Sequence, residues 1–455
     1  MNRPAEITSA PMARFLKLGL ALLLTAGMWR YFNSVLIPYQ VGEAAMHHTP
    51  RGNLSDLYPR WLGARELLLH GRDPYSAEVT REIQIGYYGE ALDNSKPSHP
   101  KDEQRFAYPA YVVFLLAPTI NAPFPLLRAA FRILLIVMAA GSVPLWMRAL
   151  GVQLERTTTA TITVLILGSV PFIYGVLLEQ LTLLVCFLMA ASCAALAHRR
   201  FVAAGILLAL STIKPQLAAG LVAWFGLWAL GDWARRQRLV WTFASSMALL
   251  WLGAEAVLPG WFGRWRAAMH AYLGYNDARS LLETVLGRYG GLLASALIAA
   301  GVALLCWRSR RAPAGSHAFS ICLVSVLAAT LLIKPKFPLY DVAMLLPAAL
   351  WLFSCRKALW ERSRPVRLLL VSASLLVGWQ WISALALTAI SLVSPSAAQR
   401  GWALPPASMF EIPLGLSCLL AVLAVDVGRI GAVSVNAGAG QSELVAMSAI
   451  GKPGG

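Results

Sequence analysis

The residues best suited to chemistry lie in a polar stretch that follows the first long apolar segment. Asp56 stands near the head of this stretch, residues 54–76, which reads LSDLYPRWLGARELLLHGRDPYS. Four apolar residues after it recur at helical spacing and share one face: Leu57, Trp61, Ala64 and Leu68. The other face is polar and carries Arg60, Arg65 and Glu66. A helix of this kind lies flat on a membrane surface, apolar face down, which would hold Asp56 between lipid and water. We therefore take Asp56 as the candidate catalytic carboxylate.

The two aspartates of this stretch also have structural interpretations. Gly71 should break the helix, and Asp73-Pro74-Tyr75 should then form a turn. An aspartate before proline is an ordinary turn residue. Aspartate is also a favoured N-cap, so Asp56 could cap the helix instead of reacting. Spacing alone leaves both alternatives open.

A second group of ionisable residues lies at the expected outer ends of apolar segments, on the same side as Asp56. The group comprises Arg128, Arg132, Glu179-Gln180, Lys214-Pro215-Gln216, Lys334-Pro335-Lys336 and Tyr340-Asp341. Lysines on the outer side run against the usual excess of basic residues in cytoplasmic loops. They would suit an anion at the outer surface, such as the phosphate of a polyprenyl-phosphate lipid.

These charged residues have simpler interpretations as well. Lys334 and Lys336 could bind ordinary anionic lipid head groups. Lys214 could reach out to the interface, although its place between two very short helices favours anion binding. Glu179 could form a structural ion pair with a lysine.

Composition restricts the class of protein. Apolar residues make up 58% of the 455 and charged residues only 13%, about half the charge of a typical soluble domain. Many segments approach the roughly 20 apolar residues that a membrane helix needs. The net charge of +17 comes mostly from short basic clusters between apolar segments, which indicates cytoplasmic loops and not nucleic-acid binding. We expect an all-α polytopic membrane protein.

The hydropathy pattern predicts about twelve transmembrane helices with both termini in the cytoplasm. Their ranges are 15–37, 126–148, 157–176, 178–197, 201–213, 217–231, 240–258, 289–307, 317–335, 339–355, 368–393 and 409–429. Segment 106–120 is short and contains prolines, so we expect it to be re-entrant or interfacial.

These helices define the expected domains. Residues 1–14 form a cytoplasmic N-terminus, and residues 15–430 the membrane domain, with outer loops at 38–125 and 259–288. The Gly/Ala/Ser-rich residues 431–455 form a disordered cytoplasmic tail.

Several well-known motifs are missing from the sequence. It contains no Walker A motif, no G-x-G-x-x-G that opens a helix after a strand, and no H-E-x-x-H. No cytoplasmic loop is long enough for a nucleotide-binding domain. This argues against a nucleotide-linked donor substrate and favours a donor substrate that is delivered within the membrane. The adjacent His47 and His48 are weak metal ligands by themselves. We expect no cofactor and no metal.

Several short motifs together resemble a known family. They are Asp56-Leu57-x-x-x-Trp61, Gly71-x-Asp73-Pro74-Tyr75, Phe106-x-Tyr108-Pro109, Lys214-Pro215-Gln216 and the Lys/Pro/Tyr stretch 334–341. In order and spacing they resemble bacterial glycosyltransferase family 87, GT-C type membrane enzymes related to polyprenyl-phosphate-mannose-dependent α-mannosyltransferases. The resemblance runs from about residue 15 to 430. The family often has Gly-Gln with a nearby Asn where this chain has Glu179-Gln180-Leu181-Thr182.

The resemblance implies a GT-C fold with an outward-facing site under the first loop. Asp56 would then be the general base that takes the proton of an acceptor hydroxyl, while polyprenyl phosphate leaves and the anomeric configuration inverts. Cationic residues would stabilise the departing phosphate; in order of preference these are Lys214, then Lys334, Lys336 and Arg128. Asp73, Tyr75, Gln180 and Gln216 would position sugar or acceptor, and Tyr108 belongs to the same site.

The resemblance also implies partners and a location. The partners are a polyprenyl-phosphate sugar donor, a lipid or glycan acceptor, and membrane lipids. The location is the bacterial cytoplasmic membrane, with the site facing the periplasm or the cell exterior. The main alternative is a secondary transporter, which would show repeated halves and broken helices at the membrane midplane. A membrane scaffold without chemistry is a third possibility.

Overall fold

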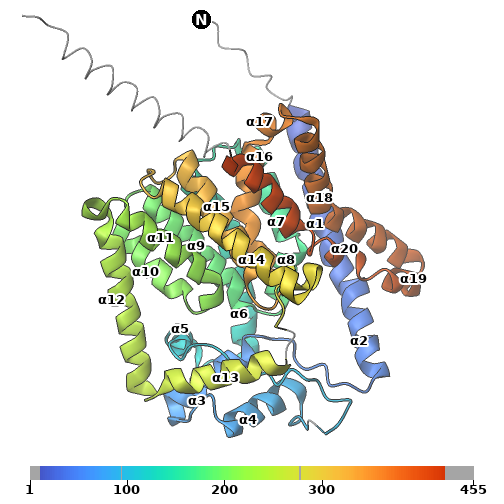
Figure 1. Cartoon of the computed structure of the whole chain (residues 1–455). Helices are drawn as coiled ribbons and strands as arrows, with labels where there is room; N and C mark the ends of the chain where they lie inside the picture. The colour runs from blue at the N-terminus through green and yellow to red at the C-terminus, as the bar shows by residue number, and fades with distance from the viewer. Residues whose placement is uncertain (1–10, 94, 276–277, 426–455) are drawn as a thin grey trace, which may run out of the picture.

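The computed structural model describes residues 11–93, 95–275 and 278–425, and every regular element in those ranges is helical (Figure 1). The first half contains α1 (Pro11–Tyr31), η1 (Phe32–Leu36), α2 (Ile37–Met46), α3 (Tyr58–His70), α4 (Ala77–Tyr88), α5 (Val112–Leu116), η2 (Ala117–Thr119), α6 (Phe124–Leu150), α7 (Arg156–Leu167), α8 (Val170–Leu177), α9 (Leu181–Ala197), α10 (Phe201–Ser211) and α11 (Pro215–Leu230). The second half contains α12 (Trp233–Val257), α13 (Trp261–Tyr275), α14 (Leu281–Ser309), α15 (His317–Ile333), η3 (Leu339–Leu345), α16 (Leu346–Ser354), α17 (Arg356–Trp360), α18 (Arg364–Val393), α19 (Pro395–Arg400) and α20 (Leu404–Ala407), and residues 412–425 are also helical.

The first helix is longer than the sequence predicts. Segments α1, η1 and α2 form one apolar helix that continues to Met46, beyond the predicted end at residue 37. The reason lies at Pro38, which normally ends a helix because it lacks an N–H. Here the π-helical turn η1 comes directly before it, and Pro38 takes the first-turn position of α2. The loop that was predicted to begin at residue 38 therefore begins after residue 46.

Long apolar helices make up the body of the molecule. Within the described residues, six helical segments are long and apolar enough to cross a membrane, and the bent pair α7–α8 gives up to seven. Their surfaces carry large exposed apolar side chains, such as Leu249 on α12 and Leu297 on α14, which are 73% and 65% exposed. Such surfaces suit lipid and not water. The chain is a multi-pass membrane protein.

The predicted count of twelve spans is not confirmed. Helical structure occurs at each of the twelve predicted positions, but α9, α10, α11, α15 and the η3–α16 segment are shorter than a full span. Each of these short helices packs against other helices; α9 contacts both α6 and α10, and α15 contacts both α11 and α14. Hydropathy alone cannot separate short packed helices from spans, because both are apolar. In segment 106–120, helix α5 has only five residues, about 7.5 Å of rise.

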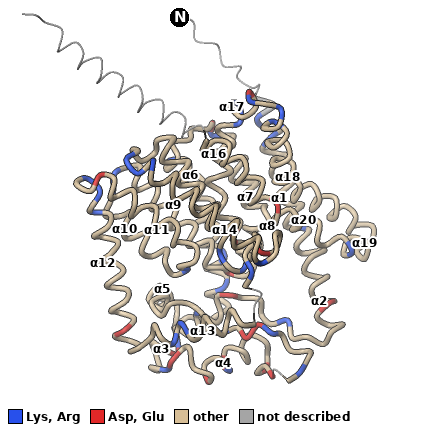
Figure 2. Tube along the Cα trace, in the orientation of Figure 1, with Lys and Arg blue, Asp and Glu red and all other residues tan. Residues whose placement is uncertain are grey.

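A layer of shorter helices lies across one end of the bundle. Figure 1 shows α3, α4 and α13 below the long helices, with the N-terminal end of α1 at the opposite end of the molecule. Figure 2 shows Lys and Arg near α17 and where α10 and α12 begin, at the far end from this layer. A second group of charges lies between the bundle and the layer.

Helix α3 forms where predicted, but its surroundings differ from the prediction. Gly71 ends it in a left-handed conformation with φ 65°, and the Asp73–Tyr75 turn follows. The expected polar face is not exposed as a whole, because Arg60 and Glu66 are 9% and 8% exposed. Protein covers α3 on several sides, since it packs against α4, α5 and η2. Amphipathic spacing within α3 could not reveal these partners, which lie in other helices.

Candidate active site

Asp56 lies in the loop just before α3, close to the turn that opens α9. Its backbone N–H donates to Leu178 O at 2.8 Å, and its carboxylate accepts a hydrogen bond from Nε2 of Gln180. Asp56 does not cap α3, whose N-cap is Leu57 and has no side-chain cap bond. The side chain is therefore available for another role, and it remains partly exposed.

A chain of polar side chains leads from Asp56 into the protein. Lys214 Nζ donates to Oε1 of Gln180 at 2.8 Å and to Oγ1 of Thr182 at 2.7 Å. Thr182 in turn donates to Oδ1 of Asp341 at 2.9 Å. These four side chains come from different parts of the sequence, and each is at most 6% exposed. Because buried polar groups need partners, the chain fixes each side chain in place.

Aromatic faces and a second cation border this chain. Lys214 Nζ lies 5.7 Å from the ring centre of Tyr108 and 5.2 Å from that of Tyr340. The guanidinium of Arg60 lies 4.7 Å from the centre of the same Tyr108 ring. A cation over an aromatic face is stabilised without losing its charge. Tyr108 thus lies close to two buried positive charges.

Lys334 and Lys336 differ in their environment. Lys334 forms an ion pair of 2.6 Å with Asp341 and also donates to Lys336 O, so its charge is compensated within the protein. Lys336 Nζ donates to the Tyr272 hydroxyl at 2.8 Å and lies over that ring, while its side chain is partly exposed. A positive φ of 58° at Lys336 turns the chain here. Of the two lysines, Lys336 is the more accessible to an outside anion.

Arg128 has two partners within the protein. Its Nε donates to the fully buried Glu179 at 3.0 Å, and one of its terminal nitrogens donates to Asn53 O at 2.9 Å. Arg132 contacts the same Glu179 oxygen at 2.5 Å. The expectation that Glu179 pairs with a lysine is wrong. Glu179 pairs instead with Arg128 and Arg132, which lie one turn apart on α6. Through these bonds Arg128 connects the loop before Asp56 to the turn that carries Gln180.

The Gly71–Tyr75 turn is bonded to two segments beside the site, the one that carries Tyr108 and helix α13. Asp73 Oδ1 accepts from the Tyr75 N–H at 2.9 Å, as in an Asx turn, and Oδ2 pairs with Arg264 of α13 at 2.7 Å. The Tyr75 hydroxyl donates to Tyr108 O at 2.6 Å. Asp73 is therefore both a turn residue and a link between the two outer loops. Gln216, at the start of α11, is exposed and lies apart from these bonds.

Burial and nearby positive charges shift the pKa of Asp56 in opposite directions. Burial raises the pKa of the Asp56 carboxyl, whereas the positive charges of Arg60 and Lys214 lower it. The balance is a raised pKa, so this carboxylate is a stronger base than an ordinary exposed aspartate. A raised basicity is what proton abstraction from a hydroxyl requires.

Sequence reasoning missed three residues of this site: Arg60, Thr182 and Asp341. Arg60 follows Asp56 by four positions, but helical spacing placed it on a solvent face. Asp341 was noted as a charge at the outer side but not as a site residue, and its partner Thr182 is 159 positions away. An acidic residue beside an apolar helix was the available signal for Asp341. Among the described residues, no group of three or more His, Cys, Asp or Glu could hold a metal ion.

The all-helical bundle places this chain among integral membrane proteins, and the polar site at one end of it could support chemistry. Sequence comparison identifies the family. The sequence model of glycosyltransferase family 87 matches residues 106–335, just over half of the chain. The chain belongs to this family. The matched region includes Tyr108, Gln180 and Lys214, and is narrower than the predicted range of 15–430. No curated protein and no solved structure matches the chain.

Proposed function

We propose that the protein moves a hexose, with mannose the first candidate, from a polyprenyl-phosphate donor to a hydroxyl of a lipid or glycan acceptor. The observation that carries this proposal is a carboxylate of raised pKa, Asp56, joined through Gln180 to the buried cation Lys214. Base and cation lie side by side at one end of a membrane bundle. Membership of a glycosyltransferase family supports a sugar transfer in this place.

The distribution of charge supports a proposal for the side of the membrane on which the site lies. Basic residues gather at the end of the bundle that holds α17, and the site lies between the other end and the α3–α4–α13 layer (Figures 1 and 2). Since cytoplasmic loops carry the excess of Lys and Arg, the site faces away from the cytoplasm. In a bacterium this is the periplasmic or outer side of the cytoplasmic membrane. A lipid-linked donor is suited to this location because soluble nucleotide sugars are cytoplasmic.

The proposed reaction is a single displacement. The acceptor oxygen attacks the anomeric carbon and forms the new C–O bond, while Asp56 takes the hydroxyl proton. The bond between the anomeric carbon and the phosphate oxygen breaks, and its electron pair leaves with polyprenyl phosphate. One base suffices because a phosphate is a good leaving group and needs no acid. The configuration at the anomeric carbon inverts.

The cations would act on the departing phosphate. Lys214 is held in place by Gln180 and Thr182 before any substrate binds. Preorganised charge of this kind stabilises a developing negative charge without reorganisation. Lys336 and Arg60 add positive charge on either side, whereas Lys334 acts through its pair with Asp341. In this assignment Arg128, Asp73, Tyr75 and Gln180 hold the site, and Tyr108 and Gln216 remain candidates for contacting substrate.

A secondary transporter is less well supported. Its charged residues should lie near the membrane midplane between repeated halves. The buried network here lies instead between the bundle and the outer layer (Figure 2). The family is one of glycosyltransferases, so a transporter would be a departure from it.

The test is sugar transfer in membranes that contain matched amounts of wild type or Asp56→Asn. With polyprenyl-phosphate-linked radiolabelled mannose, we expect Asp56→Asn to lose activity by about 10²–10⁴-fold, because an amide cannot accept the proton. Glu78→Gln is the matched control, since this carboxylate lies in the same outer layer with its side chain 86% exposed. The control should transfer sugar normally. Equal transfer by wild type and Asp56→Asn would contradict the assigned base.

A further inference from the structure

One carboxylate of the outer layer, that of Asp102, has no cation as its partner. The nearby Glu103 pairs with Arg105, whereas Asp102 forms no ion pair with any residue that the structure describes. Its Oδ1 accepts a hydrogen bond from the Gln104 N–H at 3.1 Å, and its side chain is partly exposed. A carboxylate can only accept hydrogen bonds, so an unpaired one suits a ligand that donates them.

The backbone around Asp102 is held in place by helix α4. The Tyr88 hydroxyl donates to Asp102 O at 2.8 Å, and Nε2 of Gln84 donates to Glu103 O at 3.2 Å. Gln104 is 8% exposed and has a φ of 50°, a left-handed conformation that is uncommon for residues other than glycine. Such a conformation costs energy and persists only where the surrounding structure fixes it. The position of Asp102 is therefore set by the fold and not by a loose loop.

The same end of α4 supports the segment that carries Asp56. The Asn53 N–H donates to Tyr87 O at 2.8 Å, three residues before Asp56. Asp102 is consequently close enough to Asp56 for its negative charge to raise the pKa of the Asp56 carboxyl, whereas the two buried cations of the site lower it. Asp56 is therefore influenced by cations and by a second carboxylate.

Helix α13, which crosses the outer layer with α3 and α4, adds an aromatic ring near Asp102 (Figure 1). The ring of Tyr275 is partly exposed, and the charge of Asp102 acts on its hydroxyl. That hydroxyl has no hydrogen-bond partner among the described residues, so no bond fixes the ring at its polar end. The ring centre of Tyr272, one turn earlier, lies 5.6 Å away, and Tyr272 accepts a hydrogen bond from Lys336. One turn of α13 thus connects a cation to an unpaired carboxylate.

This difference in charge distinguishes the places of the two substrates. The phosphate of the donor is attracted by Lys214 and Lys336 and repelled by the unpaired carboxylate of Asp102. A sugar ring is uncharged and has adjacent hydroxyls, so one hydroxyl can reach Asp56 while its neighbour donates to Asp102. The C–H face of such a ring is apolar and can pack on an aromatic ring.

We propose that Asp102 and the ring of Tyr275 form the acceptor subsite, and that the group which enters it is an uncharged sugar ring. Asp102 accepts a hydrogen bond from the hydroxyl beside the one that reacts, and the Tyr275 ring packs on the face of the sugar. The inference rests on the proposed function, because Asp56 takes its proton from this acceptor. It goes further by selecting a glycan over an acceptor with one hydroxyl, such as a serine side chain or a simple lipid alcohol.

The first experiment measures binding by calorimetry to the full-length protein in nanodiscs, without donor and against empty nanodiscs. The probes are the methyl α-glycosides of mannose, glucose and galactose, which have adjacent hydroxyls, and cyclohexanol, a ring of similar size with a single hydroxyl. We expect saturable binding of at least one glycoside and none of cyclohexanol. Asp102→Asn should raise the Kd of that glycoside about tenfold, because the hydrogen bond loses its charged acceptor. Tyr275→Ala should also raise the Kd, whereas Tyr275→Phe keeps the ring and should bind as wild type does.

The second experiment follows sugar transfer to the same glycoside. Asp102→Asn should raise the KM for acceptor about tenfold and leave the KM for donor unchanged. It should also move the acidic limb of kcat/KM to lower pH, because the negative charge that raises the pKa of Asp56 is gone. A merely structural role of Asp102 would not move this limb. Asp93→Asn is the matched control and should leave both readouts unchanged, since Asp93 is exposed in the same outer loop and its carboxylate binds Ser95.

The outcomes separate this proposal from the proposed function. The subsite is overturned if wild type binds none of the three glycosides, if cyclohexanol binds as tightly as they do, or if Asp102→Asn keeps the wild-type Kd. A shifted acidic limb with an unchanged KM for acceptor would also overturn it, because Asp102 would then act only through its charge on Asp56. If a glycoside binds wild type, binds Asp102→Asn more weakly and yet receives no sugar from any lipid-linked donor, the subsite stands and the proposed transfer is lost.

Discussion

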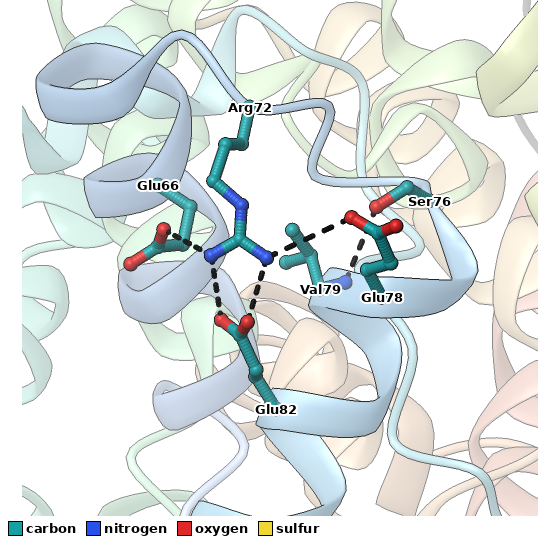
Figure 3. Close-up of polar contacts among 6 residues, drawn as sticks. All are labelled: Glu66, Arg72, Ser76, Glu78, Val79 and Glu82. Carbon is teal, nitrogen blue, oxygen red and sulfur yellow. Dashed lines mark hydrogen bonds and ion pairs between the residues drawn. The ribbon is translucent and has the colours of Figure 1, made fainter.

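Two charged clusters of this protein differ in how they balance charge. The first surrounds Arg72, which contacts Glu66 at 2.9 Å, Glu82 at 2.6 Å and Glu78 at 4.0 Å (Figure 3). It joins α3 to α4 and has three carboxylates for one cation. The Glu78 and Glu82 side chains are 86% and 42% exposed. Water screens the surplus of negative charge, so this cluster can be unbalanced.

The second cluster is the buried network from Asp56 to Lys334. Its charges alternate in sign along the sequence Asp56, Lys214, Asp341 and Lys334, with Gln180 and Thr182 as neutral links. Burial makes an unpaired charge expensive, so each inner charge has an opposite neighbour. The comparison shows that burial, and not the number of charges, distinguishes the network around Asp56 from the cluster around Arg72, which only joins two helices. The following predictions break one cluster and use the other as its reference.

The largest expected effect on stability comes from the pair Lys334–Asp341, whose side chains are 5% and 6% exposed. Asp341→Asn leaves a buried lysine without its counter-charge, which costs about 3–5 kcal/mol. Thermal unfolding in detergent should show a large drop in Tm. The double variant Lys334→Met/Asp341→Leu should recover most of it, because both charges are then gone. A single variant as stable as wild type would contradict the pairing.

The next effect concerns catalysis at Lys214. Lys214→Met should lower kcat by about 10²–10³-fold, because it removes a preorganised positive charge from the departing phosphate. The KM for donor should change much less. Lys357→Met at the opposite end of the bundle is the matched control, since Lys357 is exposed on α17. Equal loss of kcat in both variants would mean that the effect is not local to the site.

A smaller effect should appear in the pH dependence of transfer. The Asp56 carboxylate must be ionised to act, so kcat/KM should fall as pH falls through its raised pKa. Arg60 lowers that pKa, and Arg60→Met should therefore move the acidic limb to higher pH. Arg60→Lys keeps the positive charge and should leave the limb near its wild-type position. The measurement is a pH–rate profile, and an unmoved limb in Arg60→Met would argue against Asp56 as the titrating group.

Some of the residues behind these effects could be predicted from the sequence, and others could not. Apolar runs predicted helices at all twelve positions, because helix formation in such runs is a local property. Lys214 and Gln180 were chosen as charged or polar residues at helix ends, and the structure brings both beside Asp56.

Contacts between distant segments could not be predicted in the same way. Lys334 was expected to face an anion, but Asp341 compensates it. Arg60 was placed on a solvent face, because spacing along α3 cannot show that Tyr108 covers it. The short helices α9, α10, α11 and α15 have the same apolar composition as full spans, so the count of twelve stays a prediction, since depth in a bundle is decided by neighbours.

The smallest effect belongs to the exposed cluster, where Arg72 is 36% exposed. Arg72→Met should leave kcat and KM of sugar transfer unchanged and lower Tm slightly at low salt, because α3 and α4 lose their shared cation. Raising the ionic strength from about 0.15 M to about 1 M shortens the Debye length from about 8 Å to about 3 Å, so the Tm difference from wild type should shrink. The difference between Asp341→Asn and wild type should persist in the same series, because buried pairs are screened much less. If salt reduced both differences equally, the contrast between the two clusters would not come from burial, and the Asp56 network would have to be treated as another surface cluster.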